Sequence, residues 1–317
     1  YGDHRDLHLS IRRQRQMCIR DSIQTLTELP QGYDLYVDAT GFDRKFTTDM
    51  EEIGCDHHLV DSAWVSSLEL EEISSYTKSI ARPEGWQFII DLQNRTGTGY
   101  VYSSKYITDD QALTKFKSWN CDRKIITEPK LIKWRPNILK NPWTDNVVTI
   151  GLGQGFIDPL ESNGLYLIVF SITMLVKCLL KNSSPEAYNR TVRKVQQNNS
   201  NYILHHYMLT KRNDTEFWKH IDSGATNTDF TKAVHELCKH RVPNHTLFPR
   251  HEGCAGWPLW SYVLAGTGKL SDDVARRELA YNQDTRLSDT AYMYHVADHD
   301  RKAQNLPDNT EYIRSMQ

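Results

Sequence analysis

The chain has 317 residues, more than one small module needs, since domains usually span about 100–200 residues. Hydrophobic residues make up 39% and charged residues 25%, a composition that excludes wholesale disorder. The 38 basic and 40 acidic side chains nearly cancel, and general binding to nucleic acid needs an excess of Lys and Arg. The sequence therefore predicts two domains, or one large domain with an insertion, and no nucleic-acid partner.

Cysteine spacing and hydropathy indicate in which cellular compartment the protein works. The six cysteines contain no CxxC pair, which disfavours a zinc ribbon or a dense disulfide framework, and we predict no metal site. The most apolar run, Leu165–Leu180, is short for a bilayer span and contains Lys177. We interpret it as a buried helix of a soluble, cytoplasmic protein without a membrane partner.

The first 22 residues differ from the rest. Their middle is basic without a hydrophobic period, and the run Arg12–Ser22 resembles a translated sequencing adapter at the edge of an assembled fragment. We expect residues 1–22 to be non-native and the natural amino terminus to be missing. A basic arm for nucleic acid or a membrane is the alternative.

Several strands are expected in the first half. Tyr33–Gly41 has the pattern of a short strand that runs into a turn, and Trp86–Leu92 alternates like a half-buried strand. Thr96–Gly99 is expected to turn the chain before a second strand, Tyr100–Ser103. Thr108 and Gln111 have the spacing of a capping box, so a helix should follow Thr108.

A Gly-rich segment, Gly151–Gly164, lies between the buried-type strand Val147–Ile150 and the apolar helix. Three glycines within five residues permit positive φ and close backbone approach to a ligand. The start of the helix offers free amides and a positive dipole end, which suit an anion. From Ser184 onward the pattern is mostly helical.

The polar residues at this helix start allow two interpretations. In one, Ser162 or Asn163 caps the helix and Glu161 is exposed. In the other, the neighbouring apolar run tunes the pKa of Glu161 for proton transfer. The residues alone favour the first.

Two histidine clusters are weaker candidates for metal sites. His57 and His58 follow Asp56, but hydrogen-bonded or solvated histidines are the more common case. His235 and His240 are five residues apart, a spacing that turns them to different helix faces.

The run Gly151–Gly164, with Gly-Phe-Ile-Asp-Pro-Leu-Glu-Ser inside it, resembles the signature of flavin-dependent halogenases of the tryptophan-halogenase type. Three further segments match in chain order, over roughly residues 23–225. They are Tyr33–Phe42 (flavin strand and turn), Gly85–Asp91 with Gly99–Ser104 (the Trp-x-Trp-x-Ile-Pro segment and its partner), and His206–Trp218 (substrate-side helices).

The resemblance implies an α/β fold: an incomplete FAD/NAD(P)-binding, flavin monooxygenase-like domain with an inserted β-sheet and a C-terminal helical subdomain. The expected units are residues 23–181, with the sheet at about 56–130, and residues 182–317. The family's Gly-x-Gly-x-x-Gly unit and the segment with its catalytic lysine have no counterpart in the sequence. We therefore expect a C-terminal fragment that binds FAD poorly and is inactive.

The resemblance also implies a mechanism. Reduced FAD, supplied by a separate flavin reductase, reacts with O2 to give a flavin hydroperoxide. Chloride or bromide attacks it, and the hypohalous acid passes through an internal tunnel to an electron-rich aromatic substrate. A family lysine activates or carries the halogen, whereas a glutamate positions it or takes the proton of the substituted ring.

The matching positions assign roles by resemblance. Glu161 and Ser162 are the expected catalytic residues, and Asn163 and Gly164 the expected halide site. The glycines expected to line the flavin are Gly41, Gly153 and Gly155. The residues expected to contact the substrate are Trp86, Phe88, His206, Tyr207, Asn213, Phe217 and Trp218.

Departures from the family pattern leave alternatives open. Phe88 and Asp91 stand where the halogenase motif has Trp and Pro, so the alternatives are a flavin monooxygenase on the same scaffold or a non-catalytic remnant. The substrate positions read His206, Asn213 and Asp222 where enzymes for free tryptophan have Tyr, Glu and Asn. We therefore expect a substrate other than free tryptophan, such as a larger or carrier-bound aromatic, and leave a homodimer open.

Overall fold

The computed structural model describes residues 28–243 and 257–281, with 293, 296–298, 300–302, 304, 311 and 315. The expected non-native segment, residues 1–22, lies outside the described residues, as do Cys18 and Cys254. The four cysteines in the described part are free thiols, at Cys55, Cys121, Cys178 and Cys238.

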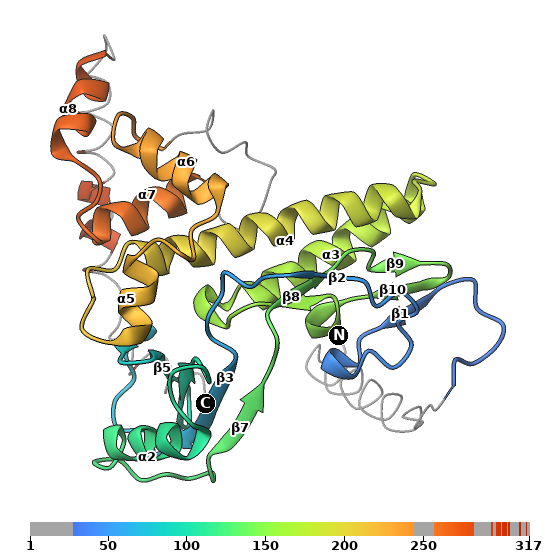
Figure 1. Ribbon diagram of the computed structural model, residues 1–317, viewed down its shortest axis with the longest axis horizontal. Helices are drawn as coiled ribbons and strands as arrows, with labels where there is room; N and C mark the ends of the chain where they lie inside the picture. Colours follow the sequence, from blue (N-terminus) through green and yellow to red (C-terminus); the bar gives the residue numbers. More distant parts are fainter. Residues whose placement is uncertain are drawn as a thin grey trace, which may run out of the picture.

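A five-stranded antiparallel sheet, the large sheet, occupies one end of the molecule (Figure 1). Its spatial order is β4-β5-β6-β3-β7. The strands are β3 (Ser62–Leu68), β4 (Lys78–Arg82), β5 (Gly85–Asp91), β6 (Thr96–Tyr102) and β7 (Lys130–Lys133). Helix α2 (Asp109–Trp119) covers one face, and the predicted capping box between Thr108 and Gln111 is confirmed.

The predicted turn at Thr96–Gly99 is wrong, because these residues form the start of β6. The chain turns earlier, where the Leu92 N–H donates to the Arg95 carbonyl over 2.8 Å. Gly99 serves packing: a Cβ there would lie 2.5 Å from the ring of Phe88 on the adjacent strand. A glycine inside a strand often marks such a close approach.

Two three-stranded sheets form the second half of the molecule. The first has the order β1-β10-β9, with β1 (Tyr36–Asp38) parallel to β10 (Val147–Thr149) and β9 (Trp143–Thr144) antiparallel to it. The second has the order β11-β8-β2, from β11 (Gly155–Phe156), β8 (Asn137–Leu139) and β2 (Glu52–Gly54). Three short 3-10 turns lie nearby: η1 (Gly41–Asp43), η2 (Gly151–Gly153) and η3 (Leu160–Ser162).

Helix α4 (Pro185–Met208) joins the parts of the fold (Figure 1). It packs against α3 (Asn163–Leu180), α5 (Glu216–Asp222), α6 (Asp229–Cys238) and α7 (Trp257–Gly266), whereas α8 (Asp272–Tyr281) follows α7 in the chain. Ile203 and Tyr207, near its carboxyl end, share a core with Trp86 of β5 and with Phe217 and Trp218 of α5. This core places α4, α5 and the large sheet around one space.

Helix α3 differs from the buried helix that its composition predicts. One face contributes Leu175 and Cys178 to a core with Trp143, Val148 and Tyr188. The opposite face is exposed at Leu165, Val169, Ile172, Val176 and Leu180, with Leu165 71% and Leu180 82% exposed. The apolar residues run all round the helix, while the packed sheet and α4 cover only one side. By length and composition alone, α3 could cross a membrane.

Candidate active site

The Gly-rich segment ends in a strained turn. Glu161 and Ser162 both adopt left-handed backbone conformations, with φ of 63° and 52°. Non-glycine residues rarely adopt this region, and such conformations concentrate at functional sites. Helix α3 starts directly after the turn, and Ser162 makes no side-chain capping bond to it. The capping interpretation for Ser162 is therefore wrong, and the first amides of α3 are not satisfied by a side chain at its N-cap.

Asn163, the first residue of α3, is only 8% exposed. Its Nδ2 is buried and has no hydrogen-bond partner among the described residues. A Cβ built on the next residue, Gly164, would meet no atom within 4 Å. A helix amino end, a buried unpaired amide and open space beside it together fit a small anion.

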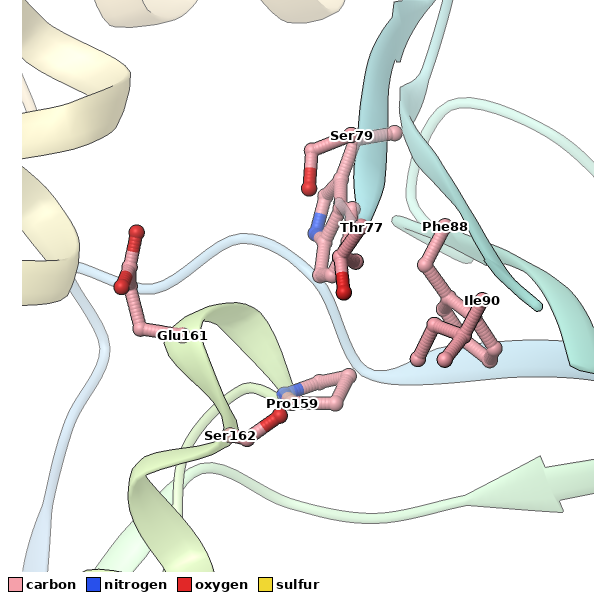
Figure 2. A pocket seen from close by; sticks show the side chains of 8 residues that line it. Thr77, Ser79, Phe88, Ile90, Pro159, Glu161 and Ser162 are labelled. Atoms are coloured by element: carbon pink, nitrogen blue, oxygen red, sulfur yellow. The ribbon is translucent and has the colours of Figure 1, made fainter. Parts of the chain in front are cut away.

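Two adjoining cavities open beside this turn. The first, about 340 Å³, is lined by Thr77, Ser79, Trp86, Phe88, Ile90, Pro159, Glu161 and Ser162. The second, about 180 Å³, is lined by Ser79, Ala81, Trp86, Leu160, His206, Tyr207, Thr210 and Trp218. In Figure 2, Glu161 lies on one side of the first cavity and Phe88 and Ile90 on the other, with Thr77 and Ser79 between them. Trp86 and Ser79 border both cavities.

Aromatic side chains from the large sheet form much of the wall. Trp86 and Phe88 project from the same face of β5, with ring centroids 6.0 Å apart. Phe88 lies over Gly99, which fixes the depth of its ring in the first cavity. The structure thus brings these two predicted substrate residues together with Glu161.

A buried carboxyl group lies behind this wall. Asp158 is 4% exposed, and its Oδ2 accepts a hydrogen bond from the Tyr207 hydroxyl over 2.6 Å. Burial raises the Asp158 pKa to about 6, although the bonds from Tyr207 and from the Leu160 N–H act in the opposite direction. The Trp86 Nε1–H lies beside the pair and lowers that pKa slightly, yet it does not reach hydrogen-bonding geometry. Asp158 therefore anchors the Glu161 turn to α4.

Glu161 contacts a histidine from α4. The Glu161 Oε1 lies 3.1 Å from His206 Nε2, and this hydrogen bond lowers the pKa of Glu161. The Glu161 side chain is 42% exposed, against 18% for His206. The predicted catalytic glutamate is therefore neither free nor buried. Glu161 lines the first cavity, His206 lines the second, and their hydrogen bond connects the two linings.

The α5 residues divide into two roles. Trp218 lines the second cavity, and its Nε1–H donates to the Arg82 carbonyl over 2.8 Å. Phe217 is 1% exposed and packs edge-on against Tyr106 in the core. Asn213 is exposed on the loop before α5 and lines neither cavity. Of these three predicted substrate residues, the structure places only Trp218 at a cavity.

The predicted flavin glycines occupy two environments. Gly41 has φ of 74° and open space at its Cα, while a Cβ on Gly153 would come within 2.8 Å of the Gly41 carbonyl. Arg44 joins the two turns, because its Nε donates to the Gly153 carbonyl over 2.7 Å. Gly155 instead packs against the Asn137 carbonyl and Gln196, so close packing alone explains the glycine there. Close packing thus accounts for both Gly153 and Gly155, and Gly41 alone of the three faces open space.

Sequence reasoning missed several residues of the site. Thr77 and Ser79 line the first cavity from the region of β4, a strand that no clear alternation announced. Asp158 stands within the recognised segment, and an acidic residue between apolar neighbours was the available signal for burial. Asp38 is a further residue of this kind, and its position at the end of the predicted strand before a Gly turn was the available signal. It accepts bonds from Thr40, Phe46 and Thr47 and so shapes the turn that contains Gly41.

The weaker histidine candidates have ordinary partners. His58 is buried against Ser200, with Nε2 2.8 Å from Oγ, and burial lowers its pKa to about 3. Between α4 and α6, the His235 Nε2 lies 2.8 Å from the His205 Nδ1. Within the described residues, no group of three potential ligands could hold a metal ion.

The fold matches solved structures of flavin-dependent halogenases. The tryptophan 6-halogenase from Streptomyces toxytricini superposes with a TM-score of 0.77 at 27% identity, over 89% of this chain and 57% of that one. BrvH, a flavin-dependent halogenase from Brevundimonas sp. BAL3, gives a TM-score of 0.73 at 26% identity, over 89% and 58%.

The sequence comparison narrows this class to a family. The tryptophan halogenase family model matches residues 13–304, so the chain belongs to the tryptophan halogenase family. It is 30% identical to the Streptomyces toxytricini tryptophan 6-halogenase SttH over 254 residues, 75% of this chain and 48% of SttH. It is 32% identical to tryptophan 7-halogenase RebH from Lentzea aerocolonigenes over 213 residues, 63% and 40% of the two chains. These matches span about half the length of the curated relatives.

Proposed function

We propose that these residues form the substrate side of a flavin-dependent halogenase site that acts on an electron-rich aromatic ring. The observation that carries this proposal is the placement of Glu161, in its strained turn, at a cavity walled by Trp86 and Phe88. A carboxylate at that position can take a proton from a ring held against the two aromatic side chains. The family match favours this function over a monooxygenase or a non-catalytic remnant.

The residues present fit the cofactors that the family implies. The turn at Gly41, against whose carbonyl Gly153 packs, would contact FAD, and the start of α3 at Asn163 and Gly164 would hold chloride or bromide. When bound, reduced FAD from a flavin reductase would supply, with O2, the oxidation of the halide. The protein's own contribution is to bind the ring, exclude water from it and accept its proton at Glu161.

The proposed substrate is an aromatic compound other than free tryptophan, larger or bound to a carrier. Among the residues that line the two cavities, Glu161 is the sole carboxylate, and His206 already contacts it. The ammonium group of a free amino acid would find no unpaired carboxylate among these lining residues. Asn213, at the position where the family has a glutamate, is exposed outside both cavities.

Calorimetric titration tests this substrate class. We expect N-acetyl-tryptophanamide to bind more tightly than free tryptophan, since the capped compound carries no charge that lacks a partner. Trp218→Leu should weaken its binding about tenfold or more, because it removes a stacking wall. Trp119→Leu is the control, since Trp119 lies on α2 and lines neither cavity. Equal affinities for the two compounds would contradict the substrate proposal.

The sequence has no counterpart of the family's Gly-x-Gly-x-x-Gly unit, and no lysine lines either cavity. We therefore propose that the 317 residues by themselves bind FAD weakly and transfer no halogen. Fluorescence titration of FAD measures the first point, and saturable binding would contradict it. A hybrid that joins the amino-terminal half of SttH to residues 28–317 tests the function itself. With flavin reductase and bromide, we expect a brominated indole product by mass spectrometry, whereas a hydroxylated product would favour the monooxygenase alternative.

In that hybrid, Glu161→Gln should lower the rate by about 100-fold or more, the usual size of a general-base contribution. Glu216→Gln is the matched control, because Glu216 is exposed and pairs only with Lys219 at the surface. An active Glu161→Gln hybrid would remove Glu161 from the chemistry.

A further inference from the structure

The geometry around His206 indicates which of its ring nitrogens carry hydrogens in the contact with Glu161. The His206 Nδ1 lies 2.9 Å from the carbonyl oxygen of Tyr202, one helical turn earlier on α4. A carbonyl oxygen can only accept, so Nδ1 must carry a hydrogen. A half-turn of the ring would place carbon atoms at both partners, so this orientation alone satisfies both contacts.

The other ring nitrogen faces a carboxyl oxygen. Since Nδ1 carries a hydrogen, an unprotonated Nε2 would present its lone pair to Glu161 Oε1 at 3.1 Å. Two acceptors at that distance repel each other, so one proton must lie between them. An imidazole is a stronger base than a carboxylate, so the shared proton lies on Nε2 and Glu161 accepts it. This contact lowers the pKa of Glu161.

We propose that His206 is a positioning residue that donates to one carboxylate oxygen of Glu161 and fixes it, leaving the other oxygen to accept the proton of the substituted ring. This inference rests on the proposed function and extends it to His206, which we matched to a Tyr of enzymes for free tryptophan. In the step, the ring C–H bond breaks, its electron pair restores the aromatic ring, and the proton forms an O–H bond with Glu161. The exposed part of the Glu161 side chain then gives that proton a route to water.

The other titratable groups packed around His206 have partners of their own. Asp158, on the loop before α3, is the nearby buried carboxyl group. Its attraction to His206 lowers the Asp158 pKa, against the larger effect of burial. His205 on α4 stays neutral, because burial lowers its pKa to about 3. Tyr202 contacts the imidazole edge-on at 4.7 Å, and Tyr207 follows it on the helix with its hydroxyl committed to Asp158. Ser79 and Ala81 of β4, which carry no charge, line the second cavity together with His206.

Carboxyl NMR of the 317-residue chain labelled with 13C-glutamate tests the pair without any halogenase activity. Glu161→Gln identifies the Glu161 signal by its loss. In the wild type we expect this signal to titrate below the ordinary 4.5, and in His206→Gln and His206→Tyr to move up toward that value. His220→Gln is the control and should leave the signal unchanged.

Histidine-labelled chain gives the second measurement. We expect the His206 Nδ1 to carry a hydrogen, bonded to the Tyr202 carbonyl, in the wild type and in Glu161→Gln alike. An unchanged Glu161 titration in both His206 variants, or a His206 ring without a hydrogen on Nδ1, would overturn the proposal. If these signals behave as expected while the hybrid transfers no halogen, only the proposed function fails.

Discussion

The two halves of the molecule bury their sheets to different extents. The large sheet is covered on both faces, by α2, whose Phe116 packs with Tyr100, and by α4 and α5 over Trp86. The β1-β10-β9 sheet packs on α3 through Val148 and Leu175, but the opposite face of α3 exposes apolar side chains. A continuous apolar face of this kind usually marks an interaction surface. Close packing around the large sheet thus contrasts with an open apolar helix in the other half.

The largest expected effect is a loss of stability on truncation of a core residue near the large sheet. Phe217→Ala should lower the free energy of unfolding by about 3–5 kcal/mol, because it removes a fully buried ring from the packed half. On the open half, Val169→Ala should change it by less than about 0.5 kcal/mol, because Val169 is 63% exposed. Denaturant unfolding measures both. A mild Phe217→Ala that selectively weakened N-acetyl-tryptophanamide binding would restore the predicted substrate role of Phe217.

A second comparison uses one buried Asp from each half. The Asp158 pKa is about 6 in the folded chain against 3.8 unfolded, so the folded state binds more protons between these values. The free energy of unfolding therefore falls as pH rises from about 4 to 6, by about 3 kcal/mol in all. Asp158→Asn should remove this fall and stabilise the chain at pH 7.5, as thermal unfolding across the pH range can show.

Asp38 should behave in the opposite sense. Burial acts to raise its pKa, but the hydrogen bonds from Thr40, Phe46 and Thr47 outweigh burial and lower it. Its contribution to stability is present above the unfolded value of 3.8 and is lost as pH falls through the lower folded pKa. Asp38→Asn should therefore destabilise the chain at neutral pH. Equal pH profiles for the two variants would contradict the assigned environments.

The smallest effect concerns the wall of the first cavity. Gly99→Ala should cost about 1–3 kcal/mol and displace the Phe88 ring, because its Cβ would lie 2.5 Å from that ring. Gly97→Ala is the matched control in the same strand, since its Cβ would meet only the Ile90 carbonyl at 3.8 Å. Calorimetry of N-acetyl-tryptophanamide binding would register the displacement, and equal affinities in the two variants would show that Phe88 does not shape the ligand site.

Local signals in the sequence predicted much of the fold. The capping box at Thr108, the alternation from Trp86 and the Gly-rich segment before an apolar helix each depend on residues close in the chain, and each predicted the element observed there. The ordered motifs also sufficed to identify the family. Gly97 and Gly99 misled, because a glycine that permits a turn also permits a close contact between strands.

The sequence by itself therefore determined the family, most element types and the segment that holds Glu161. Only the tertiary structure decided that His206 reaches Glu161, that Asp158 lies buried beneath Tyr207, and that Phe217 belongs to the core while Trp218 reaches a cavity. It also decided that α3 is covered on one side only. The physical reason is that burial and side-chain pairing depend on which distant segments pack together, and neither period nor spacing records that.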